Sequence, residues 1–63
     1  MSESTREGAE QQIRQLEARI AHQQLLAAQL AHHGYKGAAD AALVLVATLR
    51  SRVTHTVSRL LAA

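Results

Sequence analysis

The chain has 63 residues and a formal net charge of +2 at pH 7, so it is one small domain without a strongly basic or acidic tail. It contains no cysteine, which excludes disulfides and thiolate metal sites, and it contains no proline. A single core is marginal at this length, and oligomerisation is the usual remedy when disulfides and metals are missing.

Residues from about 4 to 33 are predicted to form a first helix. Ser4 and Glu7 fit a capping box at its start. Apolar residues then recur at alternating steps of three and four, as in the a and d positions of a heptad, with one glutamine among them. These seam positions are Ile13, Leu16, Ile20, Gln23, Ala27 and Leu30.

Residues 34–37 are predicted to form a turn. Gly34 suits the left-handed position that ends a helix, and Tyr35 would then fold back on Leu30. Gly37 is expected to cap the second helix. A connection this short makes the two helices antiparallel neighbours.

Residues from about 38 to 61 are predicted to form the second helix. Its apolar stripe comprises Ala42, Leu45 or Val46, Leu49, Val53, Val57 and Leu60. Four consecutive apolar residues, 43–46, cover nearly the whole circumference of the helix, which one partner helix cannot bury. We therefore expect an all-α antiparallel hairpin, a single domain over residues 1–63, that pairs into a homodimeric four-helix bundle. The expected oligomer interface consists of Leu25, Leu26, Leu43, Val44, Leu45 and Val46.

The distribution of charge also favours an antiparallel hairpin. Residues 1–20 carry a net charge of −1 and residues 21–63 a net charge of +3. Folding back about the turn would place Glu17 near the level of Arg52, and Glu10 near Arg59. Exposed pairs of this kind contribute little individually, but together they favour this register. Within the first helix, Arg6–Glu10 and Glu10–Arg14 have the spacing of helical ion pairs.

A family resemblance covers about two thirds of the chain. The stretch Arg19-Ile20-Ala21-His22-Gln23-Gln24-Leu25-Leu26-Ala27-Ala28-Gln29-Leu30, followed by Gly34 and His55, resembles a group of small uncharacterised proteobacterial proteins. The family's Gly-His-Asp-Thr turn reads Gly34-Tyr35-Lys36-Gly37 here. The resemblance implies a bacterial helical protein and assigns no activity. In size and layout the chain is also similar to the repressor-of-primer protein, an RNA-binding four-helix dimer, a likeness of fold only.

Histidines are the only candidates for metal or catalytic chemistry. His22, His32, His33 and His55 lack the i, i+4 spacing of a helical zinc site, so no metal or cofactor is expected. His55 is placed to face Ser51 and Ser58 on one helix, but no oxyanion donor or pocket accompanies them. We therefore expect a protein that is not an enzyme.

The remaining functional classes are interaction and binding. A self-associating, regulatory protein-interaction module is expected, with itself as the main partner and any other protein partner unidentified. The alternative is an RNA- or DNA-binding regulator that uses Lys36, Arg50, Arg52 and Arg59 on the dimer surface. The polar start of the chain is unlike a signal peptide, and the longest apolar stretch, residues 41–49, is half the length of a membrane span. We therefore expect a cytoplasmic protein.

Overall fold

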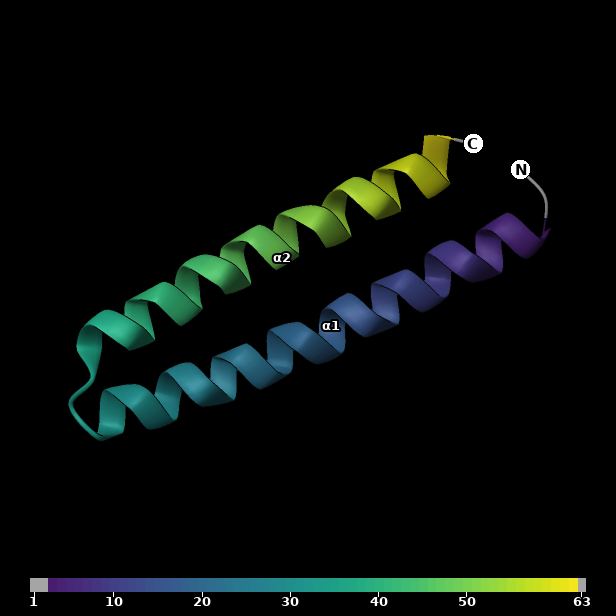
Figure 1. Cartoon of the computed structure of the whole chain (residues 1–63). Helices are drawn as coiled ribbons and strands as arrows, with labels where there is room; N and C mark the ends of the chain where they lie inside the picture. The colour runs from purple at the N-terminus through teal and green to yellow at the C-terminus, as the bar shows by residue number, and fades with distance from the viewer. Residues whose placement is uncertain (1–2, 63) are drawn as a thin grey trace.

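The fold is an antiparallel helical hairpin. The computed structural model describes residues 3–62, so residues 1, 2 and 63 of the predicted domain lie outside the described range. Two α-helices, α1 (Glu3–His32) and α2 (Lys36–Ala62), are joined by residues 33–35. They lie side by side, with the start of α1 next to the end of α2 (Figure 1). The predicted all-helical hairpin is confirmed.

The turn between the helices is a Schellman motif. The backbone N–H of Tyr35 donates to the carbonyl of Leu30 at 2.8 Å, and that of Gly34 donates to Ala31 at 3.1 Å. Gly34 has a φ of 84°, the left-handed conformation predicted for it. Tyr35 remains 63% exposed. Its contact with Leu30 is therefore the backbone hydrogen bond, and its side chain stays largely in solvent.

Both helices begin earlier than the sequence indicates. The carbonyl of Tyr35 accepts the N–H of Ala39 at 2.9 Å, so α2 begins at Lys36 and Gly37 lies inside its first turn. The predicted cap at Gly37 is therefore wrong, because the Schellman turn returns the chain to helical geometry immediately. Ser4 likewise lies within α1 and not at its cap.

The core is a heptad seam between the two helices. The predicted α1 positions are all buried or half-buried, which confirms that seam. In α2, the sequence allowed either Leu45 or Val46 at one seam position, and the structure buries Val46 there. Val57 was predicted for a later seam position, which Thr56 occupies instead. The Thr56 hydroxyl donates to the carbonyl of Arg52 at 2.9 Å, which satisfies the polar group at this position. The α2 seam comprises Ala39, Ala42, Val46, Leu49, Val53, Thr56 and Leu60.

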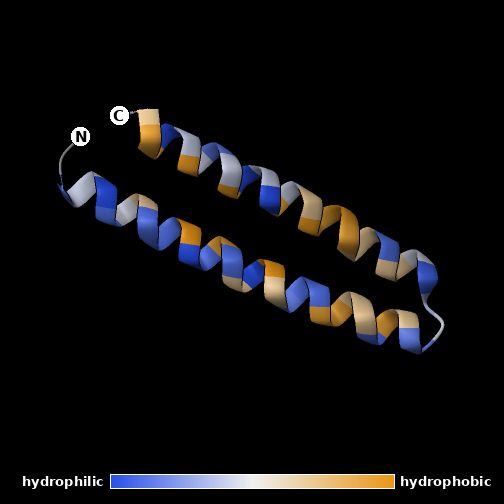
Figure 2. Cartoon of the chain, turned by 180° about the vertical axis from the view of Figure 1, so that it is seen from behind, coloured by the Kyte–Doolittle hydropathy of each residue, from blue (hydrophilic) through white to orange (hydrophobic). Residues whose placement is uncertain are grey.

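The hairpin is one layer thick. Its principal extents are 48 × 15 × 10 Å, and the shortest of these is about the diameter of a single helix. Buried hydrophobic residues are correspondingly few over residues 3–62. They are Leu16, Ala27, Ala39, Ala42, Val46 and Leu49, and three of these six are alanines. Figure 2 shows hydrophobic segments also on the outside of the hairpin, most continuously in the middle of α2.

Candidate functional site

Two faces flank the seam, and the heptad positions define them. Seam residues occupy positions a and d, whereas g and e positions lie on either side of the seam. The g face comprises Gln12, Arg19, Leu26, Leu45, Arg52 and Arg59. The e face comprises Glu10, Glu17, Gln24, Ala31, Lys36, Leu43, Arg50 and Val57. Each face carries a hollow that joins side chains of both helices, and a smaller hollow adjoins the one on the g face.

Charge is segregated between these faces. Each acidic residue of the chain falls at an e position or at the adjoining b position: Glu3, Glu7, Glu10, Glu17 and Asp40. The g positions and the adjoining c positions carry no acid. They hold three arginines and two of the four histidines: Arg19, Arg52, Arg59, His22 and His55. The g face is therefore a basic surface without neighbouring carboxylates.

This segregation explains why the predicted interhelical ion pairs do not form. Glu17 is at an e position and Arg52 at a g position, on opposite sides of the seam, and the same holds for Glu10 and Arg59. The one ion pair found over residues 3–62 is local, between Arg6 Nε and Glu10 Oε1 at 3.3 Å. The predicted Glu10–Arg14 pair is absent from this range. The hairpin register is thus set by apolar packing.

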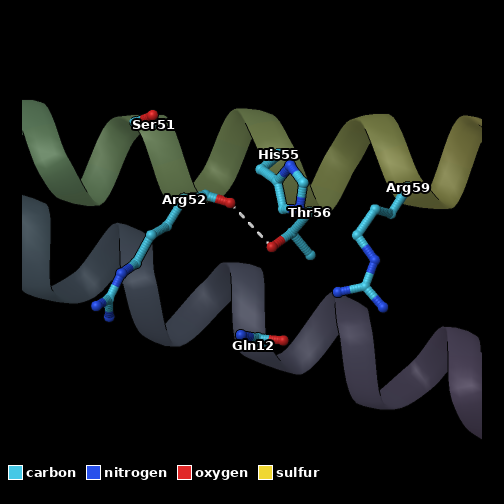
Figure 3. Close-up of a pocket in the computed structure, with 6 residues that line it drawn as sticks. All are labelled: Gln12, Ser51, Arg52, His55, Thr56 and Arg59. Carbon is cyan, nitrogen blue, oxygen red and sulfur yellow. Dashed lines mark hydrogen bonds between the residues drawn. The ribbon is translucent and has the colours of Figure 1, made fainter.

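The hollow on the g face is polar and basic. It has a volume of about 490 Å³, and its lining, which we call the arginine hollow, comprises Gln12, Ser51, Arg52, His55, Thr56 and Arg59. Figure 3 shows Arg52 and Arg59 extending from α2 toward α1, with Gln12 of α1 between them. No hydrogen bond or ion pair of either guanidinium group is found over residues 3–62.

The hollow on the e face is apolar and lined mainly by alanines. It has a volume of about 360 Å³ and lies near the turn. Its lining includes Leu43 and the oppositely charged Lys36 and Asp40. Half of the eight lining residues are alanines, which give this alanine hollow its name: Ala27, Ala28, Ala31 and Ala39. Small side chains here leave space between the helices that a larger side chain could fill.

The predicted interface residues form a belt around the hairpin. Leu25 is 60% exposed, Leu43 50% and Val44 67%. Leu45 is also exposed, and Leu26 is half-buried. Val46 is only 3% exposed because it packs in the seam, so its assignment to an outer interface is wrong.

The four predicted nucleic-acid contacts do not share one surface. Lys36 and Arg50 are at e positions, whereas Arg52 and Arg59 are at g positions and line the arginine hollow. Arg19, which was not among the predicted contacts, is on the g face with these two. Heptad phase, applied to charged as well as apolar residues, would have found it.

The four histidines do not form a cluster. The adjacent His32 and His33 contact each other edge to face, with ring centroids 5.4 Å apart. Within the described residues, no group of three or more histidine, aspartate or glutamate side chains could hold a metal ion. Neither helix over residues 3–62 combines the length and hydropathy needed to cross a membrane.

Comparisons of the chain with protein-family models, with curated proteins and with solved structures give no match.

Proposed function

We propose that the protein is a self-associating interaction module without catalytic activity, and that two hairpins pair as a four-helix bundle. The observation that carries the proposal is the apolar e face of a thin, alanine-rich hairpin, where Leu43, half exposed, lines the alanine hollow. Exposed apolar surface is unfavourable by roughly 25 cal/mol per Å². A second hairpin can cover it without disulfide or metal.

The e face is the surface proposed for pairing. Its alanine hollow accepts a protruding side chain, as a knob fits a hole between facing helices. Leu43 borders the hollow with half of its surface exposed, which supplies such a knob for the second chain. Lys36 and Asp40 at the edge offer opposite charges to a symmetric partner.

Sedimentation equilibrium tests this assembly. We expect a mass of about 14 kDa at micromolar concentration, twice the 6.8 kDa of one chain. Leu43→Gln should weaken the dimer at least about tenfold, because each interface loses two buried leucines. Leu45→Gln, the same change on the g face, should leave the dimer affinity unchanged. A folded 6.8 kDa species in the wild type would refute the proposal.

The alternative function, an RNA- or DNA-binding regulator, is favoured by the arginine hollow alone. Arg52 and Arg59 both line it, with no ion pair found for either over residues 3–62, whereas Lys36 and Arg50 lie on the other face. If this alternative holds, affinity for duplex DNA or structured RNA should fall steeply with salt, as bound phosphates release counterions. We expect no such complex at about 150 mM salt, because few cations are available on the g face.

A further inference from the structure

The arginine hollow has the features of a site for a small anion. Its six lining residues include two arginines, one histidine and no acid. Arg52 and Arg59 are seven residues apart on α2, two helical turns or about 10.5 Å along the axis. Both side chains extend toward α1 (Figure 3), so the two guanidinium groups frame the hollow from its two ends.

The surroundings maintain its positive potential. The acids of the chain are at e and b positions, on the other side of the seam. Arg19, another g-position residue, adds a third positive charge to this face. Guanidinium groups bind phosphate through paired, charge-assisted hydrogen bonds, and without a competing carboxylate these donors are available to a ligand.

Polar groups in the hollow complement these cations. The Thr56 hydroxyl donates to the Arg52 carbonyl, so its oxygen remains available as an acceptor. Gln12 and Ser51 supply further donors and acceptors from α1 and α2. A volume of about 490 Å³ is within the range of small-molecule sites.

We propose that the arginine hollow binds a small molecule that bears two or more phosphate groups. The separation of Arg52 and Arg59 matches a ligand with anionic groups at two ends, and the lining favours a small ligand over a nucleic acid. No aromatic side chain lines the hollow to stack a base, and three arginines neutralise few phosphates of a polymer. The hollow is complete in one chain, so the site does not depend on self-association.

Isothermal titration calorimetry with inorganic tripolyphosphate as the probe tests this site. At about 150 mM salt, the wild-type chain should bind with a Kd below about 1 mM, one anion per hollow. Arg52→Gln and Arg59→Gln should each weaken binding at least about tenfold. Arg50→Gln provides the matched control, with the same change on the same helix but on the e face, and should leave the Kd unchanged. Circular dichroism verifies that each variant is folded.

Three results would overturn the inference. These are no saturable binding by the wild type, an equal loss in Arg50→Gln, or much tighter binding of a 20-nucleotide single strand than of tripolyphosphate. The last result would assign the hollow to nucleic acid. Repeating the titration with Leu43→Gln, at a concentration where circular dichroism shows the variant folded, separates the two proposals, because the folded variant should bind the anion whatever its oligomeric mass.

Discussion

Gly34 is the residue at which backbone conformation decides the fold. Its φ of 84° lies in the left-handed region, and a Cβ atom added there would meet nothing within 4 Å. The demand for glycine at this position is therefore conformational and not steric. For residues other than glycine, the left-handed conformation costs roughly 1–2 kcal/mol of conformational free energy. The identity of residue 34 therefore contributes directly to the free energy of the Schellman turn.

Gly34→Ala should destabilise the protein by about 1 kcal/mol, because alanine must adopt the left-handed conformation. Gly37→Ala is the matched control. Gly37 lies in the first turn of α2, in open space, and at a helical position alanine is favoured over glycine by about 0.5–1 kcal/mol. Urea unfolding should therefore show opposite signs for the two changes. Effects of the same sign would contradict this assignment of the turn.

The seam determines stability at the level of the helices. Gln23 is its one polar residue in the predicted α1 set and is half-buried between apolar neighbours. Its amide has no hydrogen-bond partner among the contacts found over residues 3–62, and its polar atoms are not buried, so they remain open to water. A glutamine at a seam position lowers stability relative to leucine, and it can also discriminate against incorrect registers.

Gln23→Leu should raise the free energy of unfolding by about 1 kcal/mol through added apolar burial. Gln15→Leu serves as the control, because Gln15 is exposed at a c position of the same helix. Glutamine and leucine have similar helix propensities, so the difference between the two variants isolates packing. Thermal unfolding followed by circular dichroism measures both, and equal shifts in Tm would argue against a seam position for residue 23.

Hydrophobic periodicity alone predicted the seam residues of α1 correctly and those of α2 only in part. In α1, isolated apolar residues at heptad steps fix the phase, and the structure buries them as predicted. In α2, the unbroken run 43–46 is compatible with several phases, so hydropathy left Leu45 and Val46 equivalent. Thr56 was passed over for Val57 because the heptad step falls on a polar residue, whose hydroxyl bonds to its own helix.

The charged surface was misread for a related reason. Glutamates and arginines were matched by their level along the hairpin, whereas their angular position around each helix decides whether they meet. Glu17 and Arg52 share a level but occupy opposite faces. The basic g face, and with it the arginine hollow, follows from the same heptad register once the seam is known.

For the whole molecule, the sparse burial within one hairpin makes the proposed assembly the expected source of stability. Six buried residues, three of them alanine, form the core of the described hairpin. A domain below about 70–80 residues seldom gains more than about 3–5 kcal/mol from such a core. If two chains fold only together, unfolding releases two molecules, and mass action then couples Tm to protein concentration.

A hundredfold dilution should therefore lower Tm by about 10 °C. The dilution removes about 2.7 kcal/mol from the stability of a dimer that dissociates as it unfolds. At about 2.1 cal/mol/K per residue, two chains have an unfolding entropy of about 0.26 kcal/mol/K, and the ratio gives the shift. Circular dichroism melts across that concentration range measure it. A monomer that folds alone has a Tm independent of concentration, and that result would mean that the e face does not serve self-association.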